Sequence, residues 1–115
     1  MSQFPHGSDA RTKEALGFVV LLVRPQPGVA GIGYWIVPRA RGHGLATHAV
    51  SLLSQWALTD AGVARVEAWV EPENLASQRV LTAAGFRREG VLRSFLSYAD
   101  RRADAVVFSR TGKDA

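Results

Sequence analysis

The stretch that decides the fold runs from residue 33 to residue 46 and reads GYWIVPRARGHGLA. Residues 31–37 are rich in aromatic and β-branched side chains, which predicts a strand, and Pro38 ends it because proline cannot donate to the ladder. Gly42 and Gly44 follow, and Leu45 opens a long apolar periodic segment that predicts a helix. This order predicts an anion site, because the first N–H groups of a helix lack internal partners and the helix dipole adds positive charge there.

The spacing of the glycines narrows the choice of anion. Glycine has no Cβ, so a phosphate can approach the backbone closely, and Arg39 and Arg41 add positive charge beside the turn. A P-loop has four residues between its glycines and then a lysine, whereas one residue separates Gly42 from Gly44 here. A dinucleotide-binding fingerprint needs a third glycine, where this chain has Thr47. These two sites are excluded, which leaves another phosphate-bearing ligand or a tight connection that binds nothing.

Outward from this turn, apolar runs alternate with turn residues. The expected strands are 16–23, 31–37, 65–70, 86–98 and 103–108, and the expected helices are 45–60 and 74–84. This pattern predicts an α/β fold with a mixed, mostly antiparallel central sheet and flanking helices. The first helix is expected to carry one apolar face, made of Leu45, Ala49, Leu52, Leu53 and Trp56.

Length and composition indicate one ordinary globular domain. The chain has 115 residues, of which 47% are hydrophobic and 21% charged. We expect a polar N-terminal arm over residues 1–14 and a single domain over residues 15–115. No signal peptide is recognisable, and the longest apolar run, 18–23, is too short to span a bilayer, so no membrane partner is expected.

The residue types that are missing exclude several chemistries. The chain has no cysteine, which excludes disulfides, thiolate metal sites and a cysteine nucleophile, and a cytoplasmic location is expected. His6, His43 and His48 lack metal-ligand spacing, so no metal is expected. The net charge of +4 favours an anionic partner, either an anionic cofactor or nucleic acid. Nucleic acid is the less favoured partner because the sequence carries none of the recognised nucleic-acid-binding motifs.

Two motifs resemble the signatures of a known family. RGHGLA, residues 41–46, resembles the Arg/Gln-x-x-Gly-x-Gly/Ala signature of the GNAT superfamily of N-acetyltransferases, and residues 33–38 resemble the strand that precedes it. EPENLASQRVL, residues 71–81, followed by Gly85-Phe86, is similar to the second signature of that family. The resemblance covers residues 16–109 and is greatest to the branch that acetylates the N-termini of ribosomal proteins, which has aminoglycoside-modifying relatives.

The resemblance implies acetyl-CoA as co-substrate and assigns residues to it. Asn74 and Ser77 would line the cofactor near its thioester, and in the resembling branch a serine at the position of Ser77 is the proposed proton donor. Many family members place a tyrosine where this chain has Leu81. The alternative is that Asn74 caps the second helix and Ser77 completes its first turn. The pyrophosphate would bind the backbone amides of Arg41, Gly42, His43, Gly44, Leu45 and Ala46, and the pantetheine arm would pair with Trp35, Ile36 and Val37.

The general base is open at this stage. Glu67 and Glu71 share one strand face by their even spacing, and either could draw a proton from the amine through water. Each could equally be a solvated surface charge, and His43, inside the phosphate turn, is expected to be exposed.

The expected function is transfer of an acetyl group from acetyl-CoA to a primary amine, either a small molecule or a protein N-terminus. The alternatives are a catalytically inactive acyl-CoA-binding domain and a basic nucleic-acid-binding module. Family members carry a strand, two helices and another strand before the strand expected at 16–23, whereas residues 1–14 are polar here. Apolar surface should therefore be exposed, and a homodimer is expected.

Overall fold

The computed structural model describes residues 16–114, so the arm expected over residues 1–14 lies outside the described residues, and so do Ala15 and Ala115. The strands and helices that the sequence predicts are present, with bounds that differ by a few residues. They are, in chain order, β1 (Gly17–Val23), β2 (Val29–Ile36), the 3-10 helix η2 (Pro38–Ala40), α1 (Leu45–Thr59), β3 (Arg65–Val70), α2 (Leu75–Ala83), β4 (Arg87–Ser97) and β5 (Arg102–Thr111).

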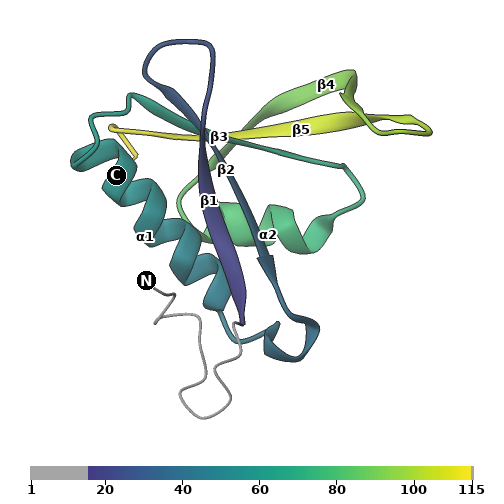
Figure 1. Cartoon of the computed structure of the whole chain (residues 1–115), viewed down its shortest axis with the longest axis horizontal. Helices are drawn as coiled ribbons and strands as arrows, with labels where there is room; N and C mark the ends of the chain where they lie inside the picture. The colour runs from purple at the N-terminus through teal and green to yellow at the C-terminus, as the bar shows by residue number, and fades with distance from the viewer. Residues whose placement is uncertain (1–15, 115) are drawn as a thin grey trace.

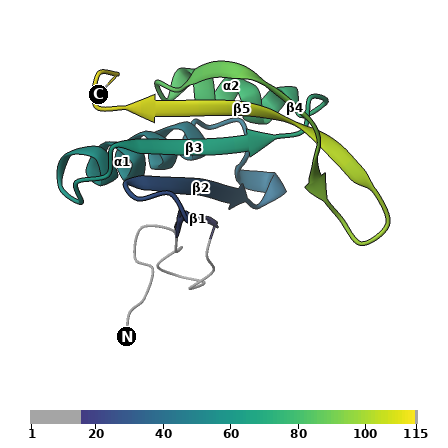
Figure 2. The same ribbon diagram turned by 90° about the horizontal axis from the view of Figure 1, so that it is seen from above.

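The strands form a single five-stranded sheet in the order β1-β2-β3-β5-β4. Only β2 and β3 pair in parallel, while the other neighbours are antiparallel, so the predicted mixed, mostly antiparallel sheet is confirmed. Both helices cover the same face of this sheet, as the two views in Figures 1 and 2 show. The opposite face carries no helix among residues 16–114.

The core lies between the helix-covered face of the sheet and the two helices. The strand β3 shows the alternation expected of a half-buried strand, since Val66, Ala68 and Val70 are buried while their neighbours are not. The strand β5, next to β3, contributes Val106 and Phe108 to the same layer. The helices complete the core with Val50, Ala57 and Leu81.

The apolar face predicted for α1 matches only in part the side that the helix buries, since Leu53 packs against the core but other members of the face do not. Leu52 and Trp56 are 58% and 50% exposed, whereas the buried residues of α1 are Val50, Ser54 and Ala57. The reason is Arg110 of β5, which lies buried beneath the helix. A buried guanidinium needs hydrogen-bond acceptors, so a polar side of α1 faces the sheet at this point.

The face opposite the helices is apolar at the β1 edge. Phe18, Val20 and Leu22 of β1 are all exposed, and the Phe18 ring stacks on Trp35 of β2 with centroids 6.3 Å apart. These four side chains are called the open face below.

A network of charges covers the same face of the sheet, farther from β1. Arg65 binds both carboxylate oxygens of Glu89, at 2.7 and 3.0 Å, and also bonds Glu67 at 2.9 Å. Ser109 donates to Glu89 at 2.6 Å. The hydrogen bonds from Arg65, and then from Ser109, lower the pKa of Glu89 to about 2.

Candidate active site

The strands β2 and β3 pair only at their first residues. Their parallel register joins Val29 to Arg65, Ala30 to Val66 and Gly31 to Glu67, and no pairs follow. Beyond Gly31 the two strands separate. Backbone and side chains of β2 are therefore available to line a cavity in the middle of the domain.

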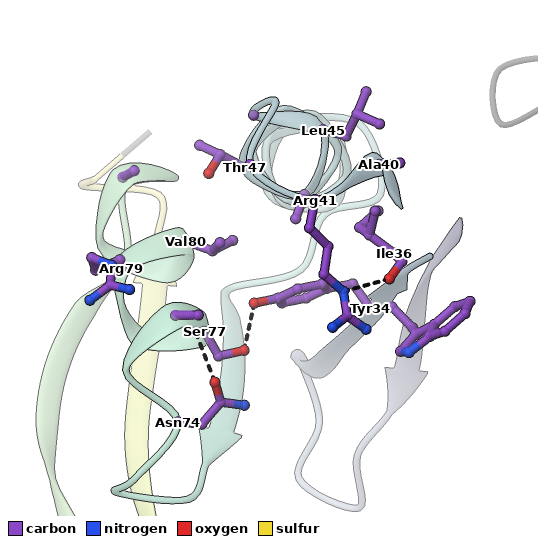
Figure 3. Close-up of a pocket in the computed structure, with 16 residues that line it drawn as sticks. Tyr34, Ile36, Ala40, Arg41, Leu45, Thr47, Asn74, Ser77, Arg79 and Val80 are labelled. Carbon is purple, nitrogen blue, oxygen red and sulfur yellow. Dashed lines mark hydrogen bonds between the residues drawn. The ribbon is translucent and has the colours of Figure 1, made fainter. Parts of the chain in front are cut away.

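A cavity of about 590 Å³ lies between β2, the start of α1 and the first turns of α2. Figure 3 shows the three walls. The start of α1 is seen end-on, α2 carries Ser77 and Val80, and β2 carries Tyr34 and Ile36. Its lining combines apolar residues with the glycine turn and with two arginines, Arg41 and Arg79. This composition suits a ligand that has both an apolar arm and negative charge.

The glycine turn leaves space next to the helix N-terminus. Gly42 and Gly44 have φ angles of +83° and +76°, which side chains other than glycine rarely adopt. A Cβ at either position would meet no atom within 4 Å. Gly44 is the N-cap of α1, and no side chain caps the helix, so the first backbone N–H groups are free to bind an anion. The turn therefore fits a phosphate group.

Most residues assigned to the cofactor lie around this cavity. Val37 and His43 do not line it, and His43 is exposed, as expected from its position in the turn. The N–H of Val37 donates to the carbonyl of Leu16 at 2.8 Å, so this N–H is not available to pair with a pantetheine arm. The Nε of Arg41 donates to the Ile36 carbonyl at 2.9 Å. The assigned residues that line the cavity are Trp35, Ile36, Arg41, Gly42, Gly44, Leu45, Ala46, Asn74 and Ser77.

Asn74 and Ser77 make separate contacts at the start of α2. The Asn74 side-chain oxygen accepts a hydrogen bond from the backbone N–H of Ser77 at 3.1 Å, which is an N-cap. The hydroxyl of Ser77 takes no part in this cap. It lies 2.5 Å from the hydroxyl of Tyr34, and Figure 3 shows the two side chains pointing toward one another.

Tyr34 is a residue that the sequence reasoning did not assign to the site. The only sequence signal is the alternation of β2, in which Tyr34 and Trp35 must face opposite sides of the sheet. In the structure Tyr34 packs against the core on the helix side, while Trp35 stacks on Phe18 on the open face. Burial raises the pKa of Tyr34 and outweighs the hydrogen bond to Ser77, which acts to lower it.

A second cavity, of about 500 Å³, lies where β3 diverges from β2. Its lining includes Trp69 of β3, Leu96 of β4, Tyr98 after β4, and the carboxylates Glu71 and Glu73. Tyr34, Asn74 and Ser77 line both cavities. The two cavities therefore meet at the Tyr34–Ser77 hydrogen bond.

The structure separates the two glutamates that were candidates for the base. Glu67 pairs with Arg65 at 2.9 Å and with Arg24 at 3.8 Å, and lines neither cavity. Glu71 lines the second cavity, where it accepts hydrogen bonds from Arg101 and, at 2.7 Å, from Tyr98. The Arg101 bond, and then the Tyr98 bond, lower the pKa of Glu71, so it is a carboxylate at neutral pH.

Neither a metal site nor a membrane span is found within residues 16–114. No three His, Cys, Asp or Glu side chains of this part of the chain lie where they could hold a metal ion. None of its helices has the length and apolarity needed to cross a membrane.

A family model described as acetyltransferase (GNAT) domain matches residues 6–87. The chain belongs to the GNAT acetyltransferase family. It is 35% identical to an uncharacterized N-acetyltransferase p20 from Bacillus licheniformis, over 76% of this chain and 49% of the relative. It is 40% identical to a probable N-acetyltransferase YjcK from Bacillus subtilis, over 63% of this chain and 40% of the relative. This GNAT chain thus spans about half the length of the curated relatives it matches.

Solved structures place ribosomal-protein acetyltransferases among the neighbours of this GNAT domain. The ribosomal-protein-S5-alanine acetyltransferase from Vibrio fischeri superposes with a TM-score of 0.83 at 25% identity, covering 93% of this chain and 60% of that one. Mycobacterium smegmatis RimJ, in complex with CoA-disulfide, superposes with a TM-score of 0.79 at 31% identity, covering 89% of this chain and 50% of RimJ. The resemblance expected from the two signatures is confirmed.

Proposed function

We propose that this GNAT domain binds acetyl-CoA in the first cavity and transfers the acetyl group to a primary amine in the second. The observation that carries the proposal is that Tyr34, Asn74 and Ser77 line both cavities. A thioester carbon held beside these residues could be reached from the opposite side by an amine. The donor and acceptor would thus approach each other through separate openings.

The first cavity has the features that coenzyme A requires. The glycine turn and the uncapped start of α1 offer backbone N–H groups to the pyrophosphate, and Arg41 and Arg79 add positive charge. The separated edge of β2 can pair with the amides of the pantetheine arm. Two related structures support this ligand, since RimJ was solved with CoA-disulfide and the microcin C7 self-immunity protein MccE with acetyl-CoA and AMP.

The chemistry requires three events. The amine loses a proton, its nitrogen forms a bond to the acetyl carbon, and the C–S bond breaks with its electron pair passing to sulfur. We assign Ser77 as the donor to the leaving thiolate and Glu71, through water, as the acceptor of the amine proton. Glu71 is the preferred base because it lines the second cavity, whereas Glu67 is held by arginines outside it.

The acceptor is proposed to be a primary amine on a protein N-terminus or a small molecule. The structural likeness to the ribosomal-protein-S5-alanine acetyltransferase favours a protein N-terminus. Carboxylates of Glu71 and Glu73 on the wall of the second cavity suit an ammonium group that must be bound before it loses its proton.

The main competing function is acyl-CoA binding without catalysis, because the chain spans only about half of its curated relatives. Calorimetry with acetyl-CoA and turnover with a panel of amines, including peptides with free N-termini, separate the two. Binding with turnover supports the acetyltransferase, binding without turnover supports the non-catalytic domain, and failure of acetyl-CoA to bind refutes both.

We also propose that the protein forms a homodimer through the open face. Phe18, Val20, Leu22 and Trp35 are exposed together on β1 and β2, and a cluster of large apolar side chains on one face is typical of an interaction surface.

A further inference from the structure

The hydrogen bond between Tyr34 and Ser77 lies where the two cavities meet. We infer that Tyr34 is the acid behind Ser77, so that its phenol supplies, through the Ser77 hydroxyl, the proton taken by the leaving thiolate. The inference rests on the proposed function and deepens it, because it gives a role to a residue on the opposite wall of the site from Ser77.

Geometry holds the pair in place from two sides. Tyr34 comes from the separated part of β2, and Ser77 from the first turn of α2, 43 positions later in the chain. The Asn74 cap fixes the backbone at Ser77, and packing against the core fixes the ring of Tyr34. When the phenol donates to Ser77 Oγ, the serine proton is left to point into the cavity.

Acidity explains why the serine needs a partner. A serine hydroxyl is a very weak acid, and giving its proton to a thiolate alone would leave an alkoxide in a partly buried site. A phenol ionises near pH 10 and a thiol near pH 8.5, so proton transfer from tyrosine to thiolate is only about 1.5 units uphill. Burial raises the pKa of Tyr34, which widens this gap and keeps the phenol protonated at neutral pH.

The step balances as follows. As the C–S bond breaks, its electron pair passes to sulfur, and the Ser77 proton moves to that sulfur. The Tyr34 proton moves to Ser77 Oγ, which leaves a neutral serine and a phenolate. Glu71 takes the proton released by the amine and passes it through water to the phenolate, so both residues end unchanged. Tyr34 acts through Ser77 and is therefore a positioning and proton-supplying residue rather than one that touches the sulfur.

The test uses binding, so that it does not depend on knowing the acceptor. Affinities of CoA and of desulfo-CoA, which lacks the thiol, are measured by calorimetry between pH 7 and pH 9.5. Donors aimed at the sulfur favour the thiolate, so the ratio of CoA affinity to desulfo-CoA affinity should rise with pH by about tenfold, equivalent to one pKa unit. Arg41, Arg79, Glu71, Glu73 and Tyr98 also line the cavities, but they face both ligands and cancel in the ratio.

Three variants carry the comparison, Tyr34→Phe, Ser77→Ala and the double variant. Each should lose the rise of the ratio with pH, and the double variant should lose no more than either single one, because the two hydroxyls act as one unit. Affinity for desulfo-CoA should stay the same, which a merely structural role would not predict. Thr82→Ala is the matched control, since Thr82 is an exposed hydroxyl on the same helix that lines neither cavity.

The outcomes separate the inference from the function on which it rests. If neither ligand binds the unaltered protein, the proposed function falls and the inference with it. If both bind but their ratio does not change with pH, acetyl-CoA binding stands and the inference is refuted. If Tyr34→Phe keeps the pH-dependent ratio while Ser77→Ala loses it, Ser77 acts alone and Tyr34 has no part in proton supply.

Discussion

Arg110 of β5 donates a hydrogen bond from Nη1 to Ser54 Oγ of α1 at 2.7 Å, and both residues are buried. The same guanidinium also donates to the Ser51 carbonyl at 3.0 Å and to the Gln55 side-chain oxygen at 2.7 Å. Three neutral acceptors on one helix therefore solvate a cation beneath it. This contact holds α1 against the sheet and so fixes the wall that carries the glycine turn.

Removing one of these acceptors should destabilise the fold. In Ser54→Ala the buried guanidinium of Arg110 loses an acceptor, and a buried donor left unpaired costs about 1–3 kcal/mol in the free energy of unfolding. Ser51→Ala is the matched control on the same helix, because Arg110 uses the backbone carbonyl of Ser51, which the substitution keeps. Urea denaturation of both variants measures the difference, and equal stability would contradict this account.

The same contact shows why the buried side of α1 could not be predicted. Periodicity identifies apolar positions, and it selected Leu52 and Trp56, which are exposed. The sequence does not reveal that Arg110, 56 positions after Ser54, is buried against the helix. Long-range polar contacts of this kind leave no local pattern, whereas the alternation of Val66, Ala68 and Val70 does, and the strand expected over residues 65–70 is present.

The candidate site was predictable to the extent that it depends on local chemistry. The glycine turn and the Asn74 cap follow from residue type and position in a helix, and the structure contains both. Tyr34 could not be assigned, because its role depends on a contact with Ser77 across the cavity. The choice between Glu67 and Glu71 likewise depends on arginines brought in from other segments, Arg24 and Arg101.

The Arg65–Glu89 pair should make stability depend on acid pH. The folded-state pKa of Glu89, about 2, lies below its ordinary value of 4.5. Its stabilising contribution is therefore complete above about pH 4.5 and is lost as the pH falls from there toward 2. Over this range, the melting temperature of Glu89→Gln should depend less on pH than that of the unaltered protein. An unchanged slope would show that Glu89 does not control this transition.

Glu71→Gln should reduce catalysis without weakening cofactor binding. Loss of the carboxylate removes the proposed acceptor of the amine proton, and general-base groups contribute about 10²-fold or more. We expect kcat/KM for the amine to fall by about that factor, while acetyl-CoA affinity stays the same. Glu67→Gln is the control, because Glu67 lies outside both cavities. An equal loss in both variants, measured per folded protein, would remove Glu71 as the base.

The open face should mediate self-association. Light scattering at micromolar concentration is expected to give twice the mass of the 12.4 kDa chain. Phe18→Ser should shift the protein toward the monomer, because it removes a large exposed ring that stacks on Trp35. Leu52→Ser, at an exposed position on α1, should leave the mass unchanged. A monomer in the unaltered protein at this concentration would refute the proposed dimer.

Gly44→Ala should weaken acetyl-CoA binding by crowding the phosphate. Gly44 has a φ angle of +76°, and a Cβ there would point into open space beside the N-terminus of α1, where the pyrophosphate is proposed to lie. Alanine in this conformation also costs about 1–2 kcal/mol of stability, so lower affinity alone would not prove a steric effect.

Gly62→Ala supplies the control that separates the two effects. Gly62 has a φ angle of +73° and equally open surroundings, but it lies beyond the other end of α1 and lines neither cavity. The two variants should therefore lose similar stability in thermal melts. Calorimetry with acetyl-CoA should show at least about a tenfold loss of affinity for Gly44→Ala alone, because a β-carbon prevents close approach of the phosphate to the backbone. Equal affinities in the two variants would place the pyrophosphate elsewhere.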